Sequence, residues 1–139
     1  MTSTASWQLQ EALYAALASN TGLTTLLGGT KIYDLAPRGA KLPYLTIRMT
    51  QERDWSTSSE EGGEHTITLH IWTDNQGRKQ TAEIMATAQE ALKTTTLILP
   101  DHHVINLSYE FSEIRRDPDG EVLHGLIRYR AITEPKTTP

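Results

Sequence analysis

The stretch EHTITLHIWTDNQGRKQTAEIMATAQEALK (residues 64–93) decides the fold, because it joins two different hydrophobic periods. Over residues 64–73, isoleucine and leucine alternate with threonine, histidine and tryptophan, and this period of two predicts a half-buried β-strand. Over residues 77–93 apolar residues recur at helical spacing, which predicts a helix capped by Asp74 or Asn75. The apolar stripe of this helix consists of Ala82, Met85, Ala88 and Leu92, flanked by Ile84 and Ala91.

The segments on either side repeat the strand pattern. Residues 44–50 (YLTIRMT) alternate and are predicted to pair with residues 64–73 as a hairpin. Residues 103–111 (HVINLSYEF) and 121–132 (EVLHGLIRYRAI) are predicted to form a second hairpin, because Asp-Pro-Asp-Gly at 117–120 suits a type I turn. The inward residues are expected to be Ile105, Leu107, Tyr109 and Phe111 on the first of these strands, and Leu123, Ile127, Tyr129 and Ala131 on the second.

The remaining segments complete the order of elements. Residues 6–19 (SWQLQEALYAALAS) carry an apolar face at helical spacing and are predicted to form a helix capped by Ser6. Residues 24–27 would add one helical turn, and residues 32–33 a short edge strand. The order helix, hairpin, helix, hairpin predicts an α+β fold, in which an antiparallel sheet of about four strands has both helices packed on one face.

Length and composition predict one thin domain. The chain has 139 residues, of which 37% are hydrophobic, and a chain of this length usually forms one domain. Leu, Ile, Val and Phe together number 29 of the 139, close to the ~20% below which disorder is common. We therefore expect one domain over residues 1–139, with its core over about 6–134 and a disordered tail at 135–139. Part of its burial would come from neighbouring molecules.

Several classes of protein are disfavoured by composition. The chain has no cysteine, which excludes disulfides, thiolate metal sites and cysteine nucleophiles. A pI near 5.7 argues against a general nucleic-acid binder. The sequence contains neither an apolar run of about 18 residues nor the basic and apolar regions of a secretory signal, so we expect a soluble protein made in the cytoplasm.

The negative charge is concentrated in the segment QERDWSTSSEEGGE (residues 51–64), whose local net charge equals the −4 of the whole chain. Its glycines and serines predict a long mobile loop between the first two strands. A tryptophan is unexpected in a purely solvating loop, so two interpretations stay open: a loop whose tryptophan packs on the domain, or a loop that contacts another molecule. The candidate residues are Glu52, Arg53, Asp54, Trp55, Glu60 and Glu61.

Two helices cover only one face of such a sheet, so the second face would be open. That face would carry tryptophan, leucine and arginine among its threonines, and exposed aromatic and arginine residues are enriched at protein interfaces. The candidate interface residues are His70, Trp72, Leu126, Arg128 and Arg130.

The sequence offers no positive support for an enzyme, and we predict no catalytic, cofactor-binding or metal-binding residue. Phosphate-loop and nucleophile-elbow motifs are absent. His70 and His124 could share a metal but lack an evident carboxylate neighbour. Two alternatives stay open. One is a small ligand-binding or enzymatic α+β domain that uses His70, His124 and Arg128; the other is a nucleic-acid module that uses a basic patch of Arg115, Arg116, Arg128 and Arg130.

Three segments resemble one protein family: PYLTIR (43–48), HTITLHIWTDNQGRKQTAEIMATAQEAL (65–92) and RRDPDGEVLHGLIRYRAITE (115–134). They are similar to the small tail-completion, or tail terminator, proteins of long-tailed bacteriophages and gene transfer agents. The resemblance spans about Leu9 to Glu134 and carries no catalytic motif. It implies a structural virion protein with an α+β sandwich fold and no cofactor.

The resemblance also implies partners and a location. The chain would form a homo-oligomeric ring, usually a hexamer, at the head-proximal end of the tail. The ring would cap the tube, stop polymerisation of the major tail tube protein and join the head-completion or connector protein; a neck-joining role stays open beside the terminator role. DNA would pass through the lumen without specific binding. The acidic 51–64 segment would either line the lumen or project onto the tube; we hypothesise that in the lumen its negative charge would repel the DNA phosphates.

Overall fold

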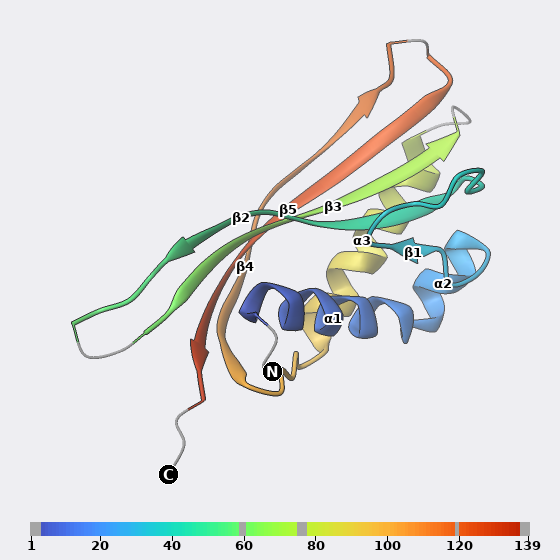
Figure 1. Cartoon of the computed structure of the whole chain (residues 1–139). Coiled ribbons are helices and arrows are strands. Elements are labelled where there is room, and N and C mark those ends of the chain that lie inside the picture. The colour runs from blue at the N-terminus through green and yellow to red at the C-terminus, as the bar shows by residue number, and fades with distance from the viewer. Residues whose placement is uncertain (1–3, 59–60, 75–77, 119, 137–139) are drawn as a thin grey trace.

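The computed structural model describes residues 4–58, 61–74, 78–118 and 120–136. These described residues form three helices and five strands (Figure 1). In chain order they are α1 (Ala5–Ala18), α2 (Thr21–Leu27), β1 (Ile32–Tyr33), β2 (Tyr44–Asp54), β3 (Gly63–Asp74), α3 (Arg78–Thr94), β4 (His102–Arg116) and β5 (Val122–Pro135). No helix in the described part of the chain is long and apolar enough to span a membrane.

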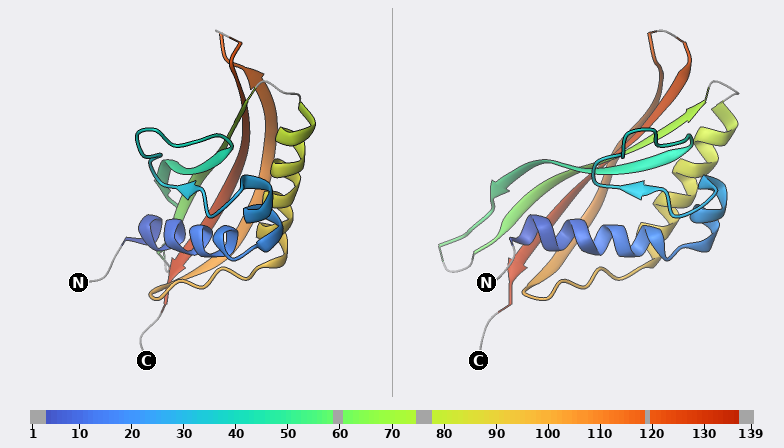
Figure 2. Two further views of the ribbon diagram at one scale, coloured as in Figure 1. Left: turned by 90° about the vertical axis from the view of Figure 1, so that its right-hand side faces the viewer. Right: turned by 45° about the vertical axis from the view of Figure 1, so that its right-hand side comes forward.

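All five strands form one sheet in the order β1-β2-β3-β5-β4. Strands β2 to β5 are antiparallel to their neighbours, whereas β1 runs parallel to β2. The helices lie on one side of the sheet (Figure 2), where α1 contacts β2 and α3 contacts β3 and β5. The predicted α+β fold with helices on one face is confirmed; the sheet is mixed and has a fifth strand, and α2 is a third helix.

The core lies between the helices and the facing side of the sheet. Its strand residues include Leu45, Ile47, Ile67, Leu69 and Ile127, none of which is exposed. This is the face that the alternating pattern predicts. On α3 the predicted stripe is wrong at Ala82, which is exposed, because the adjacent Thr81 is buried instead through a 2.7 Å bond to the Thr73 hydroxyl.

The predicted face of β4 is wrong at two positions. Irregular pairing interrupts the ladder between Val104 and Asn106 and again between Tyr109 and Phe111. Each extra residue shifts the alternation, as a β-bulge does. The expected inward residues Ile105 and Phe111 are therefore outside the core, at 57% and 40% exposure, and Val104 packs against the core in their place.

The ends of several elements differ from the predicted ones. Helix α1 is capped by the hydroxyl of Thr4, which accepts from the Trp7 amide at 3.1 Å, and Ser6 lies inside the helix. The predicted tail is ordered for two more residues, because β5 runs to Pro135 and the Lys136 amide donates to the Asp101 carbonyl. Residues 137–139 of that tail lie outside the described residues.

Two hairpins project from the body in opposite directions (Figures 1 and 2). The β4–β5 hairpin closes through the predicted turn, in which the Gly120 amide donates to the Asp117 carbonyl at 2.8 Å. The long loop predicted over 51–64 is wrong in extent. Glu52, Arg53 and Asp54 are strand residues paired with β3, because the β2–β3 ladder continues past a register shift at Met49/Gln51. The connection therefore spans only 55–62, and Glu60 within it lies outside the described residues.

Candidate interaction surface

A row of aromatic and histidine rings crosses one end of the open sheet face. Tyr33 meets Tyr44 edge-on at a centroid distance of 6.0 Å, and Tyr44 lies 6.4 Å from Trp72. Trp72 stacks on His124 at 3.8 Å with an 8° interplanar angle. His70 stacks on His124 at 4.9 Å. The rings come from β1, β2, β3 and β5, so the row joins four strands on the face away from the helices.

The two imidazoles in this row satisfy each other. His70 Nδ1 and His124 Nε2 are 2.7 Å apart. Burial, together with the charges of His124 and Arg48, lowers the pKa of His70 to about 4. Burial and the nearby Arg115 also lower the pKa of His124. Both rings are therefore neutral at pH 7. Among the described residues, no group of three potential ligands is placed to hold a metal.

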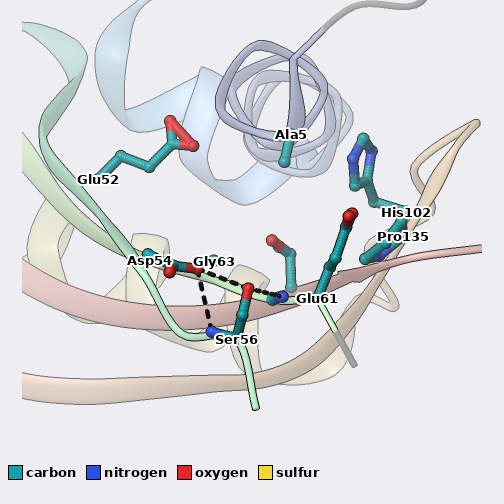
Figure 3. Close-up of a pocket in the computed structure, with 10 residues that line it drawn as sticks. Ala5, Glu52, Asp54, Ser56, Glu61, Gly63, His102 and Pro135 are labelled. Atoms are coloured by element: carbon teal, nitrogen blue, oxygen red, sulfur yellow. Dashed lines mark hydrogen bonds between the residues drawn. The ribbon is translucent and has the colours of Figure 1, made fainter. Parts of the chain in front are cut away.

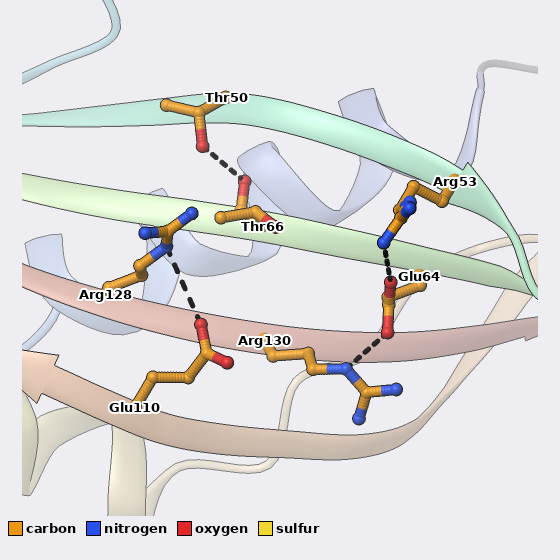
Figure 4. A network of polar contacts seen from close by, with 7 residues as sticks. All are labelled: Thr50, Arg53, Glu64, Thr66, Glu110, Arg128 and Arg130. Atoms are coloured by element: carbon orange, nitrogen blue, oxygen red, sulfur yellow. Dashed lines mark hydrogen bonds and ion pairs between the residues drawn. The ribbon is translucent and has the colours of Figure 1, made fainter.

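A second cluster on the open face is polar (Figure 4). The Glu64 carboxylate accepts from Arg130 Nε and lies 3.9 Å from Arg53 Nη1. The Arg130 guanidinium also covers the ring of Trp55 at 4.7 Å. Trp55 is 50% exposed, so this ring packs one side on the domain and leaves the other side free. The acidic hairpin is thereby fastened to the open face through its tryptophan.

Arg128 lies in the middle of the open face with incomplete bonding. Its Nε is 3.6 Å from Glu110 Oε1, beyond hydrogen-bond distance, and its guanidinium lies 5.7 Å from the Phe111 ring centroid. The Nε atom is buried and has no hydrogen-bond partner among the described residues. Buried donors nearly always have one. The Arg128 side chain as a whole is 42% exposed, so part of its guanidinium group is open to contact with another molecule.

The structure brings all five candidate interface residues onto this face, but not equally exposed. Strand register places His70 opposite Leu126 and Thr68 opposite Arg128. Leu126 is only 8% exposed, because its neighbours already cover it, so it has little area left to bury. Sequence reasoning missed three aromatic residues on this face. Tyr33 comes from the short edge strand β1, Tyr44 is the first residue of β2, and Phe111 is turned outward by the register shift in β4.

The acidic candidates divide between the two faces of the hairpin. Glu52 and Asp54 pair with His65 and Gly63 on the helix side, whereas Arg53 pairs with Glu64 on the open side. On the helix side they line a hollow of about 440 Å³ with Glu61 and His102 (Figure 3). The Ser56 hydroxyl and amide both donate to Asp54 Oδ1, and these bonds lower the pKa of this exposed carboxyl.

A polar chain that runs from the exposed Glu52 to the buried His65 and Thr133 anchors the start of α1 beside this hollow. The Ser6 hydroxyl donates to Glu52 Oε1 at 2.6 Å, so its oxygen must accept from Nδ1–H of His65, 3.1 Å away. His65 Nε2 then accepts from the Thr133 hydroxyl at 2.8 Å. Burial is the main cause that lowers the pKa of His65, which fits this neutral tautomer. The chain is complete without a ligand, so we interpret it as structural.

These histidines predict a loss of stability in acid. His65, His70 and His124 all have a native pKa below the unfolded value of 6.5, so unfolding takes up protons as the pH falls below 6.5, and for His70 this uptake continues to about pH 4. Stability should be complete above pH 6.5 and fall as the pH drops toward 4. Replacing His70 with Gln should make the acid-induced loss in the free energy of unfolding smaller by ~1 kcal/mol, a figure reduced to allow for solvent screening of a partly exposed ring.

The measurement is the melting temperature of wild type and His70→Gln at pH 7.5 and pH 4.5. We expect the acid shift to be about 3–5 °C smaller in the variant. His103→Gln, which removes an exposed histidine on β4, should keep the wild-type dependence. Equal acid shifts in His70→Gln and wild type would contradict a neutral, buried His70.

Comparison with known proteins places this fold. The family model described as "Tail completion protein gp17" matches residues 11–134. A chain in the virion of a native gene transfer agent particle has a TM-score of 0.86 and 24% identity, covering 96% of this chain and 99% of that chain. Bacteriophage SPP1 gp17 protein has a TM-score of 0.63 and 23% identity, covering 91% of this chain and 89% of that one. No curated protein matches the sequence significantly.

The two structural likenesses, at this identity, show that the fold is shared. The family match is decisive for membership, because it spans nearly all of the described chain, from α1 to β5. The chain therefore belongs to the tail completion protein gp17 family, whose role in the phage tail is structural rather than enzymatic.

Proposed function

We propose that the protein is a tail terminator, which closes into a ring at the head-proximal end of a phage or phage-like tail. The ring caps the tube, stops further addition of the major tail tube protein and presents a surface to the head-completion or connector protein. Membership of the tail completion family supports the tail role. The likeness to a chain of a gene transfer agent virion supports a place within a particle.

The observation that carries the ring is the open sheet face. One face of the sheet is covered by α1 and α3, and no helix of the described residues lies over the other. That open face presents half-buried Trp72, half-buried Arg128 and partly exposed Phe111. A contact between this face and a different surface of the next subunit is heterologous, and such contacts close into rings. The neighbouring subunit would then bury the part of the open face that the small core of one subunit leaves exposed.

Native mass spectrometry of the full chain over a range of concentrations tests this proposal. We expect six copies in one closed species, with a central hole in negative-stain images. The proposal fails if the chain stays monomeric both alone and in the presence of tail tubes. A dimer related by two-fold symmetry would also contradict it, because an isologous contact does not build a ring of six.

The acidic hairpin is proposed to line the lumen. Glu61 is exposed at the tip, and a ring repeats its charge once per subunit. Changing Glu61 to Lys would replace repulsion of DNA phosphates by attraction, so DNA should be retained during ejection. We expect a roughly tenfold lower DNA-delivery titre for particles that carry the variant, with the defect relieved by higher salt.

The matched control is Thr57→Lys, which adds one positive charge to the same tip without removing a carboxylate. It changes the charge by half as much, so it should lower the DNA-delivery titre by a smaller factor than Glu61→Lys does. Particle assembly is counted by electron microscopy to separate assembly from delivery. A Glu61→Lys particle that assembles and delivers DNA like wild type would contradict the lumen position of the hairpin.

A further inference from the structure

A hollow on the outer side of α1 has the composition of a cation site. It has a volume of about 350 Å³ and is lined by Trp7, Gln10, Glu11, Tyr14 and Asp34. The two aromatic side chains are 48% and 42% exposed, so their rings are available. Two carboxylates lie between and beside them, and no basic residue of the described chain lines this hollow.

The spacing on α1 suits a cation held between two rings. Trp7, Glu11 and Tyr14 occupy positions i, i+4 and i+7, which share one helix face. With a rise of ~1.5 Å per residue, Glu11 is ~6 Å from Trp7 and ~4.5 Å from Tyr14 along the helix axis, so its carboxylate is placed between the two aromatic residues. Cation–π attraction operates within about 6 Å of a ring centroid. The carboxylate and both rings can therefore act on one cation.

Gln10 gives an independent sign of a missing donor. Its Nε2 donates to Asp34 Oδ1 and to the Ile47 carbonyl, each at 3.1 Å, which fixes the orientation of the amide. Its Oε1 is buried and has no hydrogen-bond partner among the described residues, and the residue is only 6% exposed. Gln10 lines both this hollow and an adjoining one of about 340 Å³, to which Arg48 contributes.

The ligand chemistry favours arginine over lysine. A guanidinium is planar, stacks on indole and phenol rings, and offers several N–H groups to carboxylate and amide oxygens at once. An ammonium is a strongly hydrated point charge and gains less between two rings. A guanidinium on a side chain also reaches the hollow without the rest of its protein entering it.

From these observations we infer that the α1 hollow receives an arginine side chain from the open sheet face of an adjoining copy of the chain. This rests on the proposed ring and names the second surface that a heterologous contact requires. The charges are complementary, because the hollow carries two carboxylates and the open face carries Arg128, whose side chain is 42% exposed. The two surfaces lie on different sides of the subunit, as a ring requires.

The first test measures the site without the ring. N-acetyl-arginine amide is titrated into Arg128→Glu protein, confirmed as monomeric by mass, and the Trp7 indole N–H signal is followed by NMR. We expect a saturable shift, with the lysine analogue at least fivefold weaker. The Glu11→Gln/Asp34→Asn double variant should weaken arginine binding about tenfold. A shift that does not saturate, or that the double variant leaves unchanged, overturns the cation site.

The second test measures pairing between copies. Arg128→Glu keeps the hollow but impairs the open face, and Glu11→Gln/Asp34→Asn does the reverse. Each should be monomeric alone, and a mixture should give heterodimers that cannot grow further. Glu83→Gln/Glu90→Gln removes two exposed carboxylates from α3 instead and should assemble like wild type.

The outcomes separate the two proposals. If wild type assembles and Glu11→Gln/Asp34→Asn assembles equally well, the hollow is not the second surface, and the ring stands. If wild type remains monomeric with and without tail tubes, the ring fails, and the arginine titration alone decides whether the hollow is a cation site. Arginine binding with no heterodimer in the mixture overturns the second copy as its occupant.

Discussion

Arg128→Glu should leave the subunit folded and abolish the ring. Arg128 is on the open face with its side chain 42% exposed, so its guanidinium group can reach a neighbouring subunit. Reversing its charge removes a donor from the proposed contact and places a second carboxylate beside Glu110. Like charges brought together at an interface cost several kcal/mol, so we expect association to weaken at least ~100-fold. Native mass spectrometry across a concentration series measures the shift to monomer.

Arg78→Glu is the matched control, because it makes the same charge reversal at the exposed start of α3, in the layer of helices. It should assemble like wild type. The melting temperature of monomeric Arg128→Glu should stay within a few degrees of that of wild-type subunits. Trp72→Ala is a less selective probe, because it also removes the stacking of Trp72 on His124 within the subunit. An unchanged oligomer mass for Arg128→Glu would place the contact elsewhere.

Gly125→Val should have the largest effect on the stability of the subunit itself. Gly125 is on β5 directly beneath α3, where an added Cβ would lie 2.6 Å from Met85 Sδ and 3.0 Å from Thr81 Cγ2. Thr81 cannot move freely, because its hydroxyl is bonded to Thr73. The valine must therefore push α3 away from the sheet. We expect the free energy of unfolding to fall by ~3 kcal/mol and the melting temperature by ~10 °C.

A second substitution checks that the loss comes from this contact. Gly125→Val/Met85→Ala opens space where the valine clashes, so it should be more stable than the sum of the two single changes predicts. Denaturant unfolding of wild type, both single variants and the double variant gives the coupling. If Gly125→Val costs less than about 0.5 kcal/mol, or if the two changes simply add, α3 does not pack on β5 as closely as described.

The sequence predicts the four long strands and the two long helices, because each buries one face against the core. The alternation over 64–73 fixes which side chains of β3 point inward, and its partners β2 and β5 follow the same period. The Asp-Pro-Asp-Gly turn likewise specifies the second hairpin from local geometry. In each case the local sequence pattern and the packing of helices on the sheet favour the same structure.

The failures have a common cause, which is that pairing partners are not encoded locally. The two register shifts in β4 depend on how it fits β5, so the outward positions of Ile105 and Phe111 could not be read from alternation. Ser6 is a good cap by type, but Thr4 caps α1, since Ser6 is bonded to Glu52 and His65 across the fold. In each case, contacts with residues far away in the sequence determine the position or role of the residue.

The candidate surface was predicted in part for the same reason. Trp72 and Leu126 were identified because large apolar side chains are unexpected on a solvated strand face. Arg128 and Arg130 were identified because exposed arginine together with aromatic residues is enriched at protein interfaces. The stacking of Trp72 on His124 depends on the diagonal neighbours that register brings together. The α1 hollow depends on Asp34, which is distant in sequence from Trp7 and Tyr14 and is placed by the chain that follows β1. No local pattern signals that juxtaposition.

The most direct test of the central proposal is the length of tail tubes grown with and without the protein. Purified tube protein is polymerised, the full chain is added during growth, and tube lengths and ends are recorded by electron microscopy. A terminator ring predicts that elongation stops on addition, that six-fold density caps one end of each tube, and that Arg128→Glu does neither. Tubes that continue to lengthen with bare ends in the presence of the wild-type chain would contradict the account.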